Sequence, residues 1–238
     1  MDKNRLVKQT RTALLIYIGA IFIAMPFYAG GTYAIKEIAT SYNFFTNFLS
    51  DLGRSVSHSG DINFHSSFLF NNAMTIFGIF YGRFIYYMPN YIGNTNKNIA
   101  FLAKITSIIA CLCVIGVALT PANILSLYKL HVLLANNIFF FGGFGSALFG
   151  YLFLKSKIID DKYGWILIVY GISAAIYIYI MFFGPKPFDL ITTYNTIRYD
   201  VSVYGLTVQA SAQKAIFLIG FFTNWMTVKA IGLLDDKV

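Results

Sequence analysis

Long runs of apolar residues alternate with short polar breaks along this chain of 238 residues. Each run holds about 20 residues with almost no charge, which is what a helix needs to cross roughly 30 Å of membrane hydrocarbon. The pattern predicts an all-α, polytopic six-helix membrane bundle that forms one transmembrane domain over residues 1–238. The expected spans are Ala13–Ile35, Ser67–Met88, Ile99–Leu119, Tyr128–Leu154, Tyr163–Gly184 and Tyr204–Val228.

Composition agrees with this interpretation, because 57% of the residues are hydrophobic and only 12% are charged. Soluble domains carry about 25% charged residues. Proline and asparagine clusters mark most breaks between the runs, as in "MPN" after the second run and "GPKP" after the fifth. Pro26 lies inside the first run instead, and we expect it to kink that helix.

Lys and Arg are shared unevenly between two sets of connections. Twelve of the 18 lie in or beside the N-terminus, the second and fourth connections and the C-terminus, five lie at the other connections, and Lys214 lies within the last span. Positive residues concentrate on the cytoplasmic side of membrane proteins. We therefore expect a multi-pass protein of the cell membrane with both termini in the cytoplasm. Orientation accounts for the net charge of +8, so no nucleic-acid partner is expected.

The first outward connection contains a dense polar segment, Asn47–Ser67, between two apolar runs. Its Ser-Asp-Leu-Gly turn combines a residue that caps helices, Asp51, with a flexible one, Gly53. Phe44, Phe45, Phe48 and Leu49 precede the turn and provide apolar anchors. We expect an ordered lid or re-entrant turn over the outer end of the bundle, with Arg54, His58 and His65 at the headgroup level. A purely structural corner is the alternative.

Several spans place polar residues toward the same outer end. All three histidines lie there, and Gln209, Gln213, Gly220 and Asn224 recur on one face of the last span. Polar side chains within spans face the bundle interior or a wet cavity, although many only link helices. We expect Asp51, His131 and Lys214 to converge there, with Arg54, His131 or Lys214 as the partner of Asp51. The candidate pocket is Ser50, Asp51, Gly53, Arg54, His58, His65, Asn71, His131, Gln213 and Lys214.

Four short motifs spread over nearly the whole chain carry a family resemblance. They are Ser50-Asp51-Leu52-Gly53 after the first span, Phe70-Asn71 in the second, Pro121 followed by His131 at the fourth, and Gln213-Lys214 in the last. The chain resembles the six-helix membrane family known as domain of unknown function 998, which is similar to the Frag/DRAM/Sfk-like proteins. That family usually carries a charged pair such as Glu-Arg in the last span, where this chain has Gln-Lys.

The resemblance implies a six-helix fold and a shared polar outer site, and no particular reaction. Related proteins are linked with lipid-anchor remodelling or membrane signalling, so the resemblance implies that the partner is a membrane lipid. The leading hypothesis is an outward-facing polar pocket that binds a lipid or small amphiphile without a cofactor. Protein partners are left open.

Two other classes of function stay open, and with them the question of whether the protein is an enzyme. A metal-dependent intramembrane lipid hydrolase would hold Zn²⁺ with His58, His65 and His131, leaving a position for water. No HExxH motif supports it. A transporter or an accessory subunit is the third class, although no inverted repeat is evident.

Overall fold

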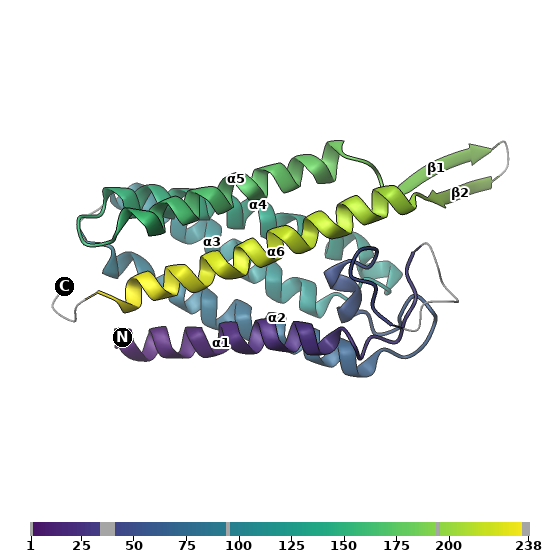
Figure 1. Ribbon diagram of the computed structural model, residues 1–238, viewed down its shortest axis with the longest axis horizontal. Coiled ribbons are helices and arrows are strands. Elements are labelled where there is room, and N and C mark those ends of the chain that lie inside the picture. The colour runs from purple at the N-terminus through teal and green to yellow at the C-terminus, as the bar shows by residue number, and fades with distance from the viewer. Residues whose placement is uncertain (1, 34–40, 94–95, 194–195, 235–238) are drawn as a thin grey trace.

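The protein folds as a bundle of six long helices, described here from a computed structural model (Figure 1). The structure describes residues 2–33, 41–93, 96–193 and 196–234, and of the strands only the backbone. The helices are α1 (Lys3–Ala24), α2 (Phe64–Tyr87), α3 (Lys97–Leu119), α4 (Leu125–Lys155), α5 (Asp161–Phe183) and α6 (Val203–Gly232). Two short 3₁₀ helices join them, η1 (Leu49–Gly53) and η2 (Met88–Tyr91).

Five of the six long helices, α1 and α3 to α6, are long and apolar enough to cross a membrane. The prediction of a helical, membrane-type fold is therefore confirmed at this level. The remaining helix, α2, has 24 residues but contains Asn71, Asn72 and Arg83, which lower its hydropathy. Exposed Leu, Ile, Phe and Val side chains surround the bundle, as expected for surfaces that meet lipid.

The first helix differs from its predicted boundaries at both ends. It begins at Lys3, because the Asp2 carboxylate caps the backbone N–H groups of Asn4 and Arg5. It ends at Ala24 instead of continuing past Pro26 with a kink. Proline has no N–H to continue the helical hydrogen bonds, and its ring hinders the preceding turn. The predicted end of this span at Ile35 lies outside the described residues.

A two-stranded antiparallel hairpin joins α5 to α6 and adds to the predicted all-α fold. It consists of β1 (Phe188–Thr193) and β2 (Thr196–Val201), with Phe188 opposite Val201 and Thr193 opposite Thr196. Figure 1 shows it projecting from the end of the bundle opposite the two termini. Pro185 and Pro187 precede it, and they prevent α5 from continuing.

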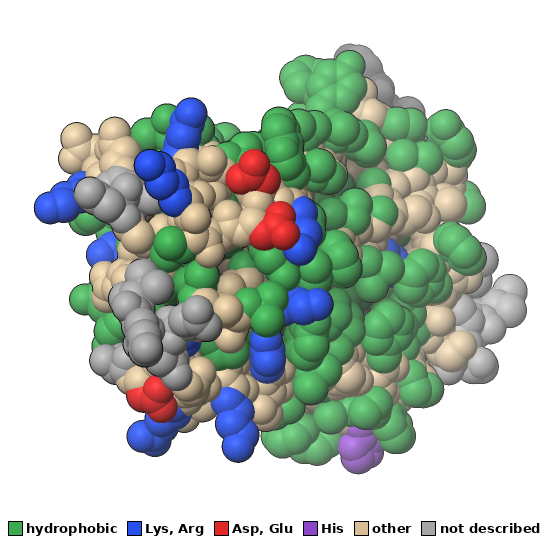
Figure 2. Space-filling model, turned by 60° about the vertical axis from the view of Figure 1, so that its left-hand side comes forward, with side chains coloured by type: hydrophobic (Ala, Val, Ile, Leu, Met, Phe, Trp, Pro, Cys, Tyr) green, Lys and Arg blue, Asp and Glu red, His purple; other side chains and the backbone are tan. Residues whose placement is uncertain are grey.

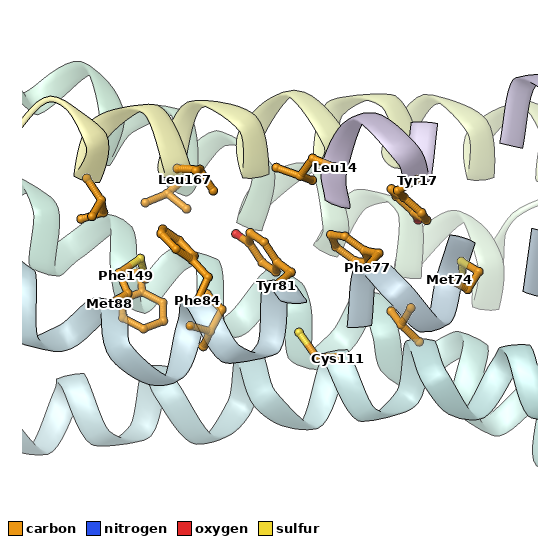
Figure 3. Close-up of a cluster of buried hydrophobic side chains, with 14 of the residues drawn as sticks. Leu14, Tyr17, Met74, Phe77, Tyr81, Phe84, Met88, Cys111, Phe149 and Leu167 are labelled. Carbon is orange, nitrogen blue, oxygen red and sulfur yellow. The ribbon is translucent and has the colours of Figure 1, made fainter. Parts of the chain in front are cut away.

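The helices form a closed ring in chain order. Each long helix from α1 to α5 packs against the next, α5 packs against α6, and α6 returns to α1. Small residues allow close approach, since a Cβ added at Gly78 of α2 would lie 2.5 Å from Ile115 of α3. Aromatic residues line the centre, with Tyr17 stacked on Phe77 at 4.4 Å between ring centroids (Figure 3).

Candidate functional site

The polar segment of the α1–α2 connection folds over the end of the bundle that carries the hairpin, as an ordered cap. Its turn forms η1, and an antiparallel bridge between Val56 and Ile62 closes the loop that follows. Leu49 and Leu52 are buried, whereas Phe44 and Phe45 are exposed. The prediction of an ordered turn is confirmed. Of its predicted anchors, Leu49 is buried and Phe48 is half-buried, whereas Phe44 and Phe45 are exposed and Leu52 is buried in their place.

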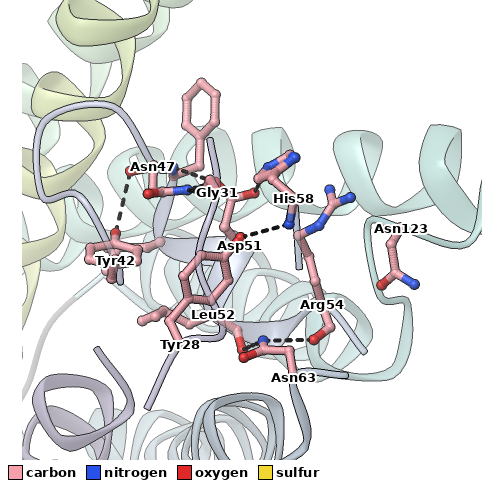
Figure 4. Close-up of polar contacts among 12 residues, drawn as sticks. Tyr28, Gly31, Tyr42, Asn47, Asp51, Leu52, Arg54, His58, Asn63 and Asn123 are labelled. Atoms are coloured by element: carbon pink, nitrogen blue, oxygen red, sulfur yellow. Dashed lines mark hydrogen bonds and ion pairs between the residues drawn. The ribbon is translucent and has the colours of Figure 1, made fainter. Parts of the chain in front are cut away.

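Asp51 is the centre of the cap, with only 1% of its surface exposed. Its Oδ2 accepts hydrogen bonds from the Phe48 backbone N–H at 2.9 Å and from Asn47 Nδ2 at 3.2 Å. Its Oδ1 lies 3.2 Å from His58 Nε2, as Figure 4 shows. All of these partners come from the same connection, so the carboxylate organises the loop around itself.

Burial by itself raises the pKa of Asp51, because it penalises the charged carboxylate. The hydrogen bond and charge of His58, the charge of Arg54 and the Asn47 amide outweigh burial, and the pKa is lowered below its ordinary value. The hydrogen-bonded partner of Asp51 is therefore His58. Of the predicted partners Arg54, His131 and Lys214, none bonds to it directly, and Arg54 acts on it through its charge. His58 turns inward, with 6% of its side chain exposed, so its predicted placement at the headgroup level is wrong.

Lys214 of α6 lies directly behind the cap. It is 2% exposed, and its ammonium donates to the backbone carbonyls of Asn47 and Ala210. The rings of Tyr42 and Phe44 lie 5.6 and 5.2 Å from Nζ and add cation–π contacts. Among the described residues no carboxylate pairs with this ammonium, and Asn47 links it to Asp51 instead. The charge is thus held by carbonyl oxygens and aromatic faces.

Side-chain amides fasten the cap to α2. Asn63 donates to the Leu52 and Arg54 carbonyls and accepts from the Ala29 N–H, which joins three parts of the connection. Asn71 Nδ2 donates to the Gly53 carbonyl at 3.2 Å. A Cβ added at Gly53 would lie 2.6 Å from Asn71 Oδ1, so this contact requires glycine. Asn71 and Gly53 therefore have a structural role.

A cavity of about 260 Å³ lies beneath the cap, between η1 and helices α4, α5 and α6. Ser50 and Asp51 form its roof, and Gln209 and Gln213 lie on its α6 side. Its other lining residues are Tyr33, Phe48, Ala122, Tyr128, His131, Val132, Ala135, Asn136, Tyr177, Met181 and Pro187. Tyr128 and Val132 are also exposed on the outside of α4, so the cavity reaches the surface of the bundle there.

The two glutamines are fixed by backbone groups. Gln213 Oε1 accepts from the Leu49 N–H at 2.7 Å, which ties α6 to the cap. Gln209 Nε2 donates to the carbonyls of Ile180 and Pro185, where α5 ends. The predicted polar face of α6 is confirmed, since Gln209, Gln213, Gly220 and Asn224 all line interior cavities.

His131 provides a buried polar atom of the cavity wall that has no protein partner among the described residues. Its Nδ1 lies 2.5 Å from the Thr120 carbonyl, and because a carbonyl only accepts, Nδ1 carries the proton. Nε2 of the neutral ring is then an acceptor, and among the described residues it has no hydrogen-bond partner. Only 4% of His131 is exposed. A buried acceptor without a partner is costly.

The structure brings together only part of the predicted pocket. Ser50, Asp51, His131 and Gln213 line the cavity, while Gly53, His58, Asn71 and Lys214 support its roof and wall. Arg54 lies outside the lining, with its guanidinium 5.9 Å above the Tyr33 ring that does line the cavity. His65 is wrong as a pocket residue, because it is exposed and packs on Phe27 and Phe64.

The alternative zinc set of His58, His65 and His131 is not assembled. Their rings contact Asp51, Phe27 and the Thr120 carbonyl respectively, and among the described residues no three groups that could ligate a metal gather. Asn47 and Asn63, the most connected amides of the cap, were missed by sequence reasoning. Asn47 precedes η1 and is separated from it by the extended residue Phe48, so no helical spacing connects it with Asp51.

Comparisons of the chain with protein-family models, with curated proteins and with solved structures found no match.

Proposed function

We propose that this is a multi-pass membrane protein whose capped cavity binds the polar end of a lipid or small amphiphile. The observation that carries the proposal is the cavity itself, which combines a buried charged roof and the unpartnered His131 acceptor with apolar walls. Ligand sites are typically apolar with a few convergent polar groups. The opening beside Tyr128 and Val132 faces the side of the bundle, which suits a ligand that arrives from a membrane.

The membrane arrangement that we propose has six spans, with both termini cytoplasmic and the cap outside. Figure 2 supports it, because Lys and Arg side chains gather over the end of the bundle that carries the termini. Residues of this basic end include Arg5, Lys8, Arg83, Lys97, Lys155, Lys157, Lys162 and Lys229, all exposed. The α2 helix packs between α1 and α3, and its 24 residues correspond to about 36 Å, enough to cross with them.

Charge around the cap favours an anionic headgroup. Asp51 is paired with His58, while Arg54 and Lys214 each bring a positive charge and no other carboxylate lines the described cavity. Arg54 is half-buried at the rim, where it could donate charge-assisted hydrogen bonds to a ligand at the opening. The family resemblance, with its implied lipid handling, points to the same class of ligand.

Two adjacent asparagines of α4 provide a matched test of binding. Asn136 lines the cavity, whereas Asn137 lies outside the lining and bonds to the Leu133 carbonyl of its own helix. Native mass spectrometry would follow retention of palmitoyl lysophosphatidylglycerol by the purified protein. We expect Asn137→Leu to retain the lysolipid as the wild type does, and Asn136→Leu to retain about tenfold less, the loss of one or two good contacts. Equal retention by all three proteins would overturn the proposal.

Cysteine labelling would test the membrane arrangement. The native Cys111 and Cys113 are buried and give little background. Ser126 at the capped end and Asp160 at the basic end are both exposed. In intact cells, Ser126→Cys should react with an impermeant maleimide and Asp160→Cys should not. The reverse pattern would contradict the orientation.

A further inference from the structure

Two smaller cavities continue from the capped cavity into the centre of the helix ring. The first, of about 100 Å³, shares Ser50, Ala135 and Gln213 with the capped cavity. The second, of about 70 Å³, shares Phe77, Val114, Ile138, Tyr170 and Asn224 with the first. Shared walls at both junctions make these three spaces one series, which runs from the cap along α6.

The two inner cavities are mainly apolar. Tyr17, Phe70 and Phe217 line the first, and Tyr81, Phe149 and Leu167 line the second. Asn224 is the polar residue common to both. A buried water needs two to four polar partners, and an engineered cavity of about 150 Å³ with Leu, Ile and Phe walls stays dry and binds an apolar ligand. These walls therefore suit hydrocarbon better than water.

The length of the series suits one acyl chain. On α6 its lining extends from Gln213 to Thr227, which corresponds to about 21 Å of helix. One leaflet of a membrane is about 15 Å thick, half of the roughly 30 Å hydrocarbon core, and an acyl chain of a membrane lipid fits that thickness. The space is narrow, since a Cβ added at Gly220 would lie 3.1 Å from the Tyr170 ring. Two chains therefore cannot lie side by side in it.

We infer that the inner cavities hold a single acyl chain of the amphiphile whose polar end occupies the capped cavity. This inference rests on the proposed function and narrows the ligand to one that places one unbranched chain in the protein interior. The chain would run from Gln213 past Tyr170 toward the basic end. A ligand bound in this way would fill the voids between α1, α2 and α6. The side chains that line these voids otherwise lack contacts on one side.

The test varies the chain of the ligand and the width of the path together. Palmitoyl and octanoyl lysophosphatidylglycerol would be added in equal amounts to the protein in detergent, and native mass spectrometry would give the ratio of the two bound species. Val114 lies at the junction of the inner cavities, and Val114→Phe would block it. Leu112→Phe on the exposed side of the same helix is the matched control.

The wild type and Leu112→Phe should bind the palmitoyl lipid in preference, and Val114→Phe should reduce that preference about tenfold, which corresponds to roughly 1.4 kcal/mol. Binding of the octanoyl lipid should not change. A preference for the long chain that survives in Val114→Phe would overturn the inference while leaving the proposed function intact. Binding of neither lipid by the wild type would overturn the proposed function. If Val114→Phe does not fold, Ile138→Phe narrows the same junction from α4.

Discussion

The two ends of the bundle use polar residues in opposite ways. At the basic end, Lys and Arg side chains are exposed and spread over several helix termini. At the capped end, Asp51, Asn47, Asn63 and Lys214 are buried, and each bonds to backbone groups. Charge near a membrane surface can orient a protein while it stays in water, whereas charge removed from water needs bonded partners.

Two aspartates make this difference concrete. Asp160 at the basic end caps α5 and pairs with Lys162, and both side chains are more than half exposed. Asp51 pairs with His58, and both are almost fully buried. Exposed pairs contribute little because water and salt screen them. Buried charges are costly to leave without a partner, so the same residue type matters far more at the capped end.

The largest effect is expected from Asp51→Ala. The change removes the acceptor for the Phe48 N–H, Asn47 Nδ2 and His58, and leaves these groups buried without it. We expect a loss of about 3 kcal/mol in the free energy of unfolding. Denaturant titration in detergent would measure it, with Asp160→Ala as the control that should lower stability much less, because it removes only an exposed helix cap and an exposed ion pair. An Asp51→Ala protein as stable as the control would remove the contrast between the two ends.

The fit between η1 and α2 is tested by Gly53→Ala. The new methyl group would lie 2.6 Å from Asn71 Oδ1 and 2.8 Å from the Phe70 ring, so the cap must shift. We expect a loss of about 2 kcal/mol, typical of overpacking. Gly19→Ala in α1 is the control, because nothing lies within 4 Å of its added Cβ and alanine favours a helix. Equal midpoints of thermal unfolding for the two variants would show that η1 does not pack closely on α2.

A smaller effect is expected from Arg54→Ala, and on binding instead of folding. Arg54 contacts Tyr33 and the Val56 carbonyl at the rim, so its loss leaves the buried network in place. Retention of palmitoyl lysophosphatidylglycerol should fall about fivefold, the scale of one modest interaction. Palmitoyl lysophosphatidylcholine should be affected less. Lys157→Ala at the basic end is the matched control. An equal loss of lysolipid retention in that variant would show that a positive charge promotes binding wherever it lies on the protein.

The smallest effect concerns pH. Because folding lowers the pKa of Asp51, its stabilising contribution is fully present above the ordinary carboxyl pKa of about 3.9 and is lost as pH falls through the lowered value. We expect the stability difference between the wild type and Asp51→Asn to shrink below about pH 4. Unfolding measured from neutral to acid pH would show it. A difference that stays constant over this range would mean that folding does not lower the pKa of the Asp51 carboxyl group.

The sequence by itself determined the fold class. Apolar runs of membrane length predicted the bundle, because backbone groups in hydrocarbon must be satisfied within helices. It also located η1, because Asp51 and Gly53 are typical of a turn, and it identified the interior face of α6 from the spacing of Gln209, Gln213, Gly220 and Asn224. These features depend on periodicity and on local chemistry, which a single chain displays directly.

Tertiary structure decided which residues meet. Asp51 bonds to His58 instead of the predicted partners because the Val56–Ile62 bridge folds the loop back on itself. Nothing in the spacing of these residues specifies that path. The interior series of cavities likewise depends on how α6 closes against α1, which brings side chains distant in sequence together. Local propensity acts between near neighbours, whereas partners and cavities follow from packing among all six helices.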